Sequence, residues 1–320
     1  MKKSSSCNIK TSIGGQALIE GVMMRGPKTT AMAVRNPEGE IVLEVSENEV
    51  KKKNKLLTLP IIRGVFNFIA SMKMGYKCLM RSAEIAGLEE IEKEEAEKAA
   101  KEGKKDHSGA WMNAMMVIAS VLGVVLAMFL FVALPSFLYS LLSRISDFFS
   151  PDNRYLRSAF EGILKVVILV AYMSAISLMK DIRRTFMYHG AEHKTIFCYE
   201  SGEELTVENV KKQKRFHPRC GTSFLILMVL VGILVGFFIP PSLPTLLRVG
   251  IRILLLPVIM GIGYELIKFA GRHDNIITKI ISAPGVGLQH LTVFEPDDEM
   301  IECAIAAMKA VIPEDGSDKI

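Results

Sequence analysis

Cysteine, tryptophan and excess charge are all scarce in this sequence. Its 320 residues include five cysteines and one tryptophan, and the formal net charge is only +5. The cysteines, odd in number and irregularly spaced, exclude the disulfide framework of a small secreted domain. So modest a net charge gives no sign of a nucleic-acid partner, and we expect none. The basic N-terminus is followed by polar residues rather than by an apolar stretch, so we expect no cleaved signal peptide.

Apolar residues, in contrast, make up 50% of the chain and are gathered in long runs. Residues 112–134 and 222–239 carry no charge, and Pro135 closes the first of them. Residues 162–179 and 246–264 are apolar stretches with charged residues at or near their ends. Because about 20 apolar residues let a helix cross a bilayer, we expect about four transmembrane helices. The alternative is that the two weaker stretches are buried helices of a soluble protein.

Lysine and arginine fall mainly on one side of these runs. Residues 1–111, 180–221 and 268–320 hold 33 of the 39. Loops rich in these residues face the cytoplasm, so we expect both termini there. Residues 56–72 are apolar apart from Arg63 and are predicted to form an interfacial or re-entrant helix; a fifth span is the alternative.

The predicted fold class is mainly α: a polytopic integral membrane protein with about four transmembrane helices and a small α+β cytoplasmic layer. Residues 31–45 have the alternation of a β-hairpin around a Pro-Glu-Gly turn. The runs divide the chain into six parts. These are an N-terminal cytoplasmic segment with a Gly-rich motif, the hairpin and the interfacial helix (1–83), a charged arm (84–111), a first helical pair (112–180), a cytoplasmic His/Cys loop (181–221), a second helical pair (222–266) and a C-terminal cytoplasmic tail (267–320).

The strongest chemical signal is the stretch His-Gly-Ala-Glu-His, which begins at His189. His189 and His193 are four residues apart, so on a helix they share one face and can bind one metal ion. The same order occurs in inverted zinc peptidases, where the glutamate, here Glu192, is the general base. Gly190 weakens the case for a helix. An ordinary hydrogen-bonded pair of histidines is the alternative.

A second pair, His217 and Cys220, follows in the same predicted cytoplasmic loop. Together with His189 and His193 it would complete the nitrogen and sulfur set that zinc favours. Four protein ligands would make a closed, structural site, whereas three would leave a position for water and allow hydrolysis. Cys220 also precedes a predicted helix, whose dipole lowers a thiol pKa, so a role as a nucleophile is a further alternative.

Five further polar residues are weaker candidates. Three lie in the Gly-rich residues 14–27 and one in residues 284–291, where glycine allows unusual backbone angles and close approach. Turns under a packed cytoplasmic layer are the simpler explanation, and neither stretch has the pattern of a phosphate loop. The fifth, at the inner end of the last predicted span, is a candidate ligand or an interfacial anchor. The three in residues 14–27 are Gln16, Glu20 and Arg25, the one in residues 284–291 is His290, and the fifth is Glu265.

Four motifs in sequence order resemble those of the YqhQ family: GGQALIEGVMMRGP, YHGAEHKTIFCYE, HPRCGTSF and PGVGLQHLTVFEPDDEM. The resemblance covers residues 13–307. This is a bacterial membrane family with a domain of unknown function, described as a predicted metal-dependent enzyme. It implies that the Gly-rich motif, residues 189–193 and residues 217–220 belong together, and that the protein lies in the bacterial inner membrane.

The leading hypothesis is a zinc site at the cytoplasmic membrane face, bound by His189 and His193 and completed by His217, Cys220 or Glu265. If it is catalytic, we expect a hydrolase with Glu192 as base and a membrane-associated peptide or lipid as substrate. The first alternative is a non-enzymatic scaffold or assembly factor with structural zinc or none. A transporter comes third, because no predicted span carries paired charges at its middle. The bilayer is the one partner that we expect.

Overall fold

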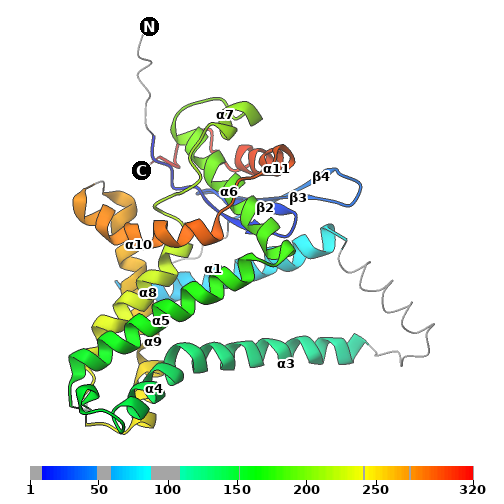
Figure 1. Cartoon of the computed structure of the whole chain (residues 1–320). Coiled ribbons are helices and arrows are strands. Elements are labelled where there is room, and N and C mark those ends of the chain that lie inside the picture. Colours follow the sequence, from blue (N-terminus) through cyan, green and yellow to red (C-terminus); the bar gives the residue numbers. More distant parts are fainter. Residues whose placement is uncertain are drawn as a thin grey trace, which may run out of the picture.

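The computed structural model describes residues 9–48, 59–87, 109–150, 152–240, 242–273 and 275–319. The predicted fold, mainly helical with a small β component, is confirmed. The sheet, α6, α7 and α11 gather at one end of the molecule, and α5, α8 and α9 run away from it toward α4 (Figure 1). Most of the expected charged arm lies outside the described residues. The helical elements are α1 (Ile62–Ile85), α3 (Gly109–Met128), the π-helical η2 (Phe129–Ala133), α4 (Leu134–Leu142), the 3-10 turn η3 (Asp147–Phe149), α5 (Arg154–Ser177), α6 (Lys180–Glu200), α7 (Val207–Lys211), α8 (Thr222–Gly236), α9 (Thr245–Arg272), α10 (Ile276–Thr292) and α11 (Asp298–Lys309).

Four strands form an antiparallel meander in chain order. The turn read from the sequence joins the third strand to the fourth. The Gly-rich motif forms a hairpin of its own, because Glu20 adopts a positive φ of 50° in the turn between the first two strands. A Cβ on residue 21 would lie only 2.3 Å from the carbonyl oxygen of Ala33. Because Gly21 has no side chain, the third strand can approach the second this closely. The strands are β1 (Gly14–Leu18), β2 (Gly21–Arg25), β3 (Thr29–Arg35) and β4 (Ile41–Glu47).

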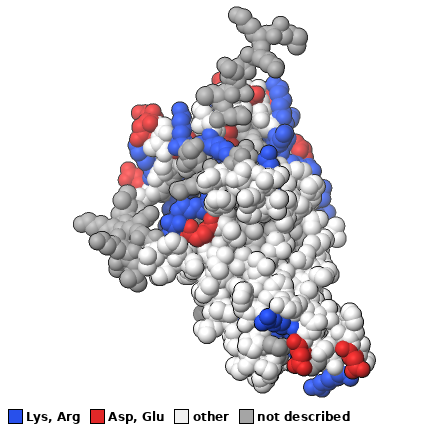
Figure 2. Space-filling view, turned by 90° about the vertical axis from the view of Figure 1, so that its left-hand side faces the viewer, with Lys and Arg blue, Asp and Glu red and all other residues white. Residues whose placement is uncertain are grey.

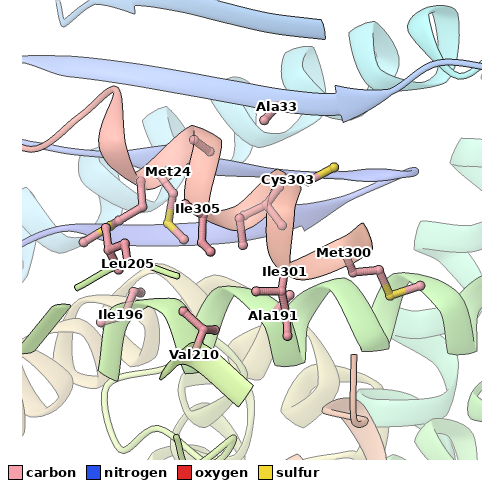
Figure 3. Close-up of a cluster of buried hydrophobic side chains, with 14 of the residues drawn as sticks. Met24, Ala33, Ala191, Ile196, Leu205, Val210, Met300, Ile301, Cys303 and Ile305 are labelled. Carbon is pink, nitrogen blue, oxygen red and sulfur yellow. The ribbon is translucent and has the colours of Figure 1, made fainter. Parts of the chain in front are cut away.

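Both faces of this sheet are covered by helices. Side chains alternate between the faces of a strand, so Val22 and Met24 meet α6 and α11 while Met23 meets α1. Figure 3 shows α11 with Met300 and Ile301 among the side chains that fill the first of these interfaces. The strands therefore lie between two helical layers, α6 with α11 on one face of the sheet and α1 on the other.

Helix α1 connects the sheet to the apolar helices. Its C-terminal half packs on the sheet, and its beginning packs on α9 at a glycine contact. A Cβ on Gly64 would lie 2.9 Å from Cβ of Tyr264, so only glycine allows the two helices to come this near. Arg63, at the same contact, forms an ion pair with Glu265.

Three helices are long and apolar enough to cross a membrane, and not the four that the sequence predicts. The three are Ile118–Leu142, Arg154–Ser177 and Thr245–Gly271. The fourth, α8, has 15 residues, and at 1.5 Å per residue it is about 22 Å long, less than the roughly 30 Å of a bilayer core. Its helix ends at Gly236, before the proline-rich segment that follows.

Pro135 does not end the first apolar helix, contrary to the prediction. The chain passes through the π-helical turn η2 into α4, where Pro135 lies at the start of the new helical segment. Proline has no N–H to donate and its ring crowds the preceding turn, and a wider π turn removes both difficulties without breaking the helix. The apolar helix thereby runs on to Leu142.

The surface of these helices is unusually apolar. Leu122, Val124 and Val125 are each more than half exposed, and so are Val167 on α5 and Leu254 on α9. Figure 2 shows charged side chains at one end of the molecule and a small group at the other, with a broad uncharged zone between them. Exposed apolar patches of this size mark a surface that is covered by lipid or by a partner.

Candidate metal centre

Helix α6 places three chemically active side chains on one face. His189, Glu192 and His193 follow one another at helical spacing, and Gly190 does not interrupt the helix. Glycine is needed there because a Cβ would lie only 2.0 Å from the carbonyl oxygen of Phe294. The chain between α10 and α11 therefore passes directly over this turn of α6.

Backbone carbonyls fix the orientation of both imidazoles. His189 donates from Nδ1 to the oxygen of Thr292 at 3.0 Å, and His193 donates from Nδ1 to that of Arg215 at 2.5 Å. A carbonyl can only accept, so Nδ1 carries a proton in each ring, and in the neutral form of the imidazole Nε2 has the lone pair. This arrangement is usual for histidines that bind metals through Nε2.

The two free lone pairs and a thiol converge. Sγ of Cys220 lies 3.1 Å from Nε2 of His189, and the three potential ligand atoms of His189, His193 and Cys220 are within 4.8 Å of one another. Nε2 of His193 is buried and has no hydrogen-bond partner among the described residues. Zn–N and Zn–S bonds of about 2.0 and 2.3 Å in a tetrahedral site separate such atoms by roughly 3.5 Å. The three side chains are close enough to hold a metal ion after a small adjustment of their positions.

Cys220 lies where α8 begins, and two groups of the first turn approach its sulfur. The backbone N–H of Thr222 lies 3.4 Å from Sγ, and the hydroxyl of the same residue lies 3.2 Å away. These two contacts fix the position of the sulfur at the start of α8.

Glu192 is buried beside this group. One carboxylate oxygen lies 3.8 Å from Nε2 of His189, and the backbone N–H of Gly15 donates to the carboxylate. Burial raises the pKa of Glu192, although His189 and the Gly15 hydrogen bond both oppose the shift. Gly15 leaves the space for it, since a Cβ there would lie 2.7 Å from Cγ of Glu192. The first motif and the histidine motif thus meet at one point.

His217 lies near this group, but its nitrogens are directed elsewhere. The backbone N–H of Arg219 donates to its Nδ1 at 3.3 Å, and its Nε2 faces Glu200 at 3.8 Å. Gln289 brackets its backbone with two hydrogen bonds, at 2.8 and 2.7 Å. Burial lowers the pKa of His217 to about 4, so the ring is neutral at pH 7. Gln289, which the sequence analysis did not single out, thereby holds the loop that carries Cys220.

The weaker candidates are distributed over other parts of the fold. Gln16 and Arg25 line a cavity of about 430 Å³ between the β1–β2 hairpin and α1. Glu20 forms an ion pair with Arg184 and accepts a hydrogen bond from Tyr188 at 3.2 Å. Two others lie outside the His/Cys group: Glu265, which pairs with Arg63, and His290, which is exposed and stacks on Phe216.

Sequence reasoning missed a cluster of buried charges at the opposite end of the apolar helices. Arg157 donates from Nε to Glu161 at 3.2 Å, and Arg252 of α9 forms an ion pair with the same carboxylate. All three side chains are almost completely buried, and so is Arg248. The signal was the i, i+4 spacing of charged residues at the start of both helices, which puts each pair on one helix face.

Fold and site together define a class: a chain with helices fit to cross a bilayer that holds a His/Cys group in a separate sheet-and-helix layer. Within that class the chain belongs to the family described as "Protein of unknown function (DUF1385)", which matches residues 59–314. It is also 35% identical over 310 residues to "Uncharacterized protein YqhQ" of Bacillus subtilis (strain 168), covering 96% of this chain and 94% of that protein. The resemblance to the YqhQ family is confirmed. No solved structure matches the chain.

Proposed function

We propose that this protein is a multi-pass membrane protein with a zinc centre bound by His189, His193 and Cys220, and that it is a zinc-dependent hydrolase. The observation that carries the proposal is the convergence of two Nε2 lone pairs on one thiol, with each imidazole fixed by a backbone carbonyl. A metal ion between these side chains would give the buried Nε2 of His193 the partner that it lacks among the described residues.

Three protein ligands leave one position of a tetrahedral ion for water, which is the pattern of catalytic zinc. Bound zinc supplies a Lewis acid that makes this water acidic. Glu192 would accept the proton in our proposal, because its carboxylate lies buried beside His189 and next to Gly15. The cavity lined by Gln16 and Arg25 reaches Gly15, against which Glu192 packs, and offers a place for substrate.

A structural zinc site is the second candidate. It is favoured because the parts of the site come from separate elements. The histidines belong to α6, and the carbonyls that orient them belong to Thr292, at the end of α10, and to Arg215, which lies before α8. A metal ion there would join segments that are far apart in the sequence and would stabilise the layer. The protein would then act as a membrane scaffold or assembly factor.

Metal content measured on protein purified in detergent tests the ligands. We expect about one zinc per chain in the wild type and none in His193→Ala or Cys220→Ser. The matched control is His290→Ala, which removes an exposed histidine and should keep the metal. His217→Asn should also keep it if three ligands suffice. A metal-free wild type, or equal zinc in all four variants, would refute the site.

Cobalt substitution separates the two functions. Cobalt in an open three-ligand site changes its visible spectrum when azide is added, whereas a closed site does not respond. We expect a response that Glu192→Gln leaves in place, because Glu192 is not a ligand in the proposal. No response to azide in a fully loaded sample would favour the structural site. Loss of cobalt itself in Glu192→Gln would make this residue a ligand and remove it as a base.

A further inference from the structure

The charge cluster at the far end of the apolar helices holds more cations than its carboxylate can neutralise. Arg157, Arg248 and Arg252 are 4%, 0% and 7% exposed, and Glu161 between them is 1% exposed. Lys165, one turn farther along α5, interacts electrostatically with Arg252 and Glu161. These four cations and one carboxylate leave three positive charges in excess inside an apolar part of the fold.

Part of this cluster is already satisfied. Glu161 pairs with Arg157 and Arg252, and hydroxyl groups accept the remaining bonds of these arginines: Ser140 from Arg157 at 3.0 Å and Ser136 from Arg252 at 2.6 Å. These contacts hold both arginines in place, but one carboxylate balances only one of their two positive charges.

The other half is not satisfied within the part of the chain that the structure describes. Arg248 donates from one nitrogen to the carbonyl of Pro240, but its Nε and Nη2 are buried without a partner, and so is Oγ of Ser158. Lys165 forms no ion pair with any described residue. Arg248 is thus a buried guanidinium and Lys165 a partly exposed ammonium, and neither has a carboxylate partner in the described chain.

An apolar cavity of about 320 Å³ opens directly beside these charges. Lys165 and Arg252 line one part of it, and the rest is formed by apolar side chains of η2, α5, α8 and α9, among them Phe131, Leu169 and Ile259. A water-soluble anion has no use for such walls, whereas a hydrocarbon chain attached to the anion would fill them.

We propose that this cavity binds an anionic membrane lipid, with its phosphate group beside Lys165 and Arg252 and an acyl chain along the apolar walls. The proposal depends on the membrane placement proposed above but not on the zinc centre. Phosphate would bring negative charge and acceptor oxygens to the two cations that line the cavity, in a cluster whose one carboxylate balances only one of four positive charges. Cationic pockets between membrane helices bind lipid headgroups in this manner.

Two substitutions test the cationic part and the apolar part of the proposed lipid site separately. Lys165→Gln removes a cation that has no ion-pair partner in the described chain, so it should leave the fold intact and relieve repulsion from Arg252. Gly232→Leu fills the cavity: Gly232 lines it, and a Cβ there meets only Cδ1 of Ile259, at 3.9 Å. The matched control is Arg154→Gln, which removes an exposed arginine at the same end of α5.

Native mass spectrometry of the full chain, released from nanodiscs with equal parts phosphatidylglycerol and phosphatidylcholine, measures the bound lipid. We expect one retained phosphatidylglycerol per wild-type chain and in Arg154→Gln. Retention should fall at least tenfold in Lys165→Gln and in Gly232→Leu, while melting temperatures in detergent show that both variants are folded. Equal retention of both lipids, or unchanged retention in the two folded variants, would overturn the proposal.

Inorganic phosphate distinguishes a lipid from a free anion. In detergent without lipid, phosphatidylglycerol should raise the melting temperature of the wild type, and inorganic phosphate at the same concentration should not. Protection by inorganic phosphate that equals protection by the lipid would mean that the cluster binds a soluble anion, and the lipid proposal would then be wrong. Loss of zinc would leave this result unchanged, so the two proposals fail independently.

Discussion

Replacing Gly190 by alanine is a direct test of how closely the chain passes over the metal centre. An added Cβ would lie 2.0 Å from the carbonyl oxygen of Phe294, whereas real Cβ atoms essentially never approach another heavy atom within 3.0 Å. The segment after α10 must therefore move by at least 1 Å. That segment includes Thr292, whose carbonyl holds His189, and Phe294, whose N–H donates to Phe186 at 3.0 Å.

Two opposing effects determine the magnitude. Alanine stabilises a helix by about 1 kcal/mol relative to glycine, but overpacking of a rigid backbone contact costs about 1–3 kcal/mol or more. Because the obstructing atom is backbone rather than a flexible side-chain end, we expect a net loss of about 1–2 kcal/mol and a weaker hold on zinc. Gly287, in the middle of α10, has no atom within 4 Å of its would-be Cβ, so Gly287→Ala should stabilise the protein instead.

The assay is thermal unfolding in detergent together with zinc retention against a chelator. The two glycine variants should shift the melting temperature in opposite directions, and only Gly190→Ala should release zinc more readily. If Gly190→Ala were as stable as Gly287→Ala and kept its zinc, the close approach of Phe294 and its role in fixing His189 would both be wrong.

Three further predictions, on buried charge, core packing and proton binding, can be checked by the same unfolding assay. Glu161→Gln strands two buried arginines and should cost about 3–5 kcal/mol, whereas Glu265→Gln breaks a partly exposed pair worth less than about 1 kcal/mol; equal losses would contradict the burial of the first pair. Met300→Ala empties a site in the main core and should cost about 2–5 kcal/mol, while Met72→Ala, at a side chain that is 56% exposed, should change little. His217 binds a proton near pH 6.5 when unfolded, but burial lowers its pKa to about 4 in the fold. The unfolded chain therefore takes up the proton first, and metal-free protein should lose up to about 3 kcal/mol as the pH falls from 6.5 to 4. Replacing His217 by glutamine should remove this part of the pH dependence, and an unchanged pH profile would speak against a buried neutral ring.

Local patterns predicted the helical class and the alternation of the third and fourth strands. In β3, Ala31 and Ala33 alternate with Met32 and Val34, and both sets are buried because helices cover the two faces of the sheet. The glycine-rich stretches were harder. Residues 14–18 and 21–25 became strands and residues 284–291 part of a helix, since Gly15, Gly21 and Gly285 serve close packing rather than turns. At Gly285 a Cβ would lie 2.2 Å from Oγ of Ser223 on α8, and such a long-range contact leaves no mark on local sequence.

The candidate site could be predicted in part for a similar reason. Helical spacing placed His189, Glu192 and His193 together, and the chemistry of zinc pointed to Cys220. Whether His217 joins them depends on Arg219 and Glu200, which take its two ring nitrogens, and on the Gln289 amide from another helix. These are tertiary contacts that spacing along the chain does not reveal.

Only Leu178 and Met179 separate the end of α5 from the beginning of α6. A residue spans at most about 3.6 Å, so this link can absorb a displacement of only some 7 Å. Any larger movement of α5 along its axis must carry α6 with it, and α6 bears the histidines. A movement of α5 at Glu161, near one end of the helix, is therefore transmitted to His189 through the backbone, without intervening side chains. The apolar helix α5 and the helix that carries the two histidines thus form a single, nearly continuous piece of backbone.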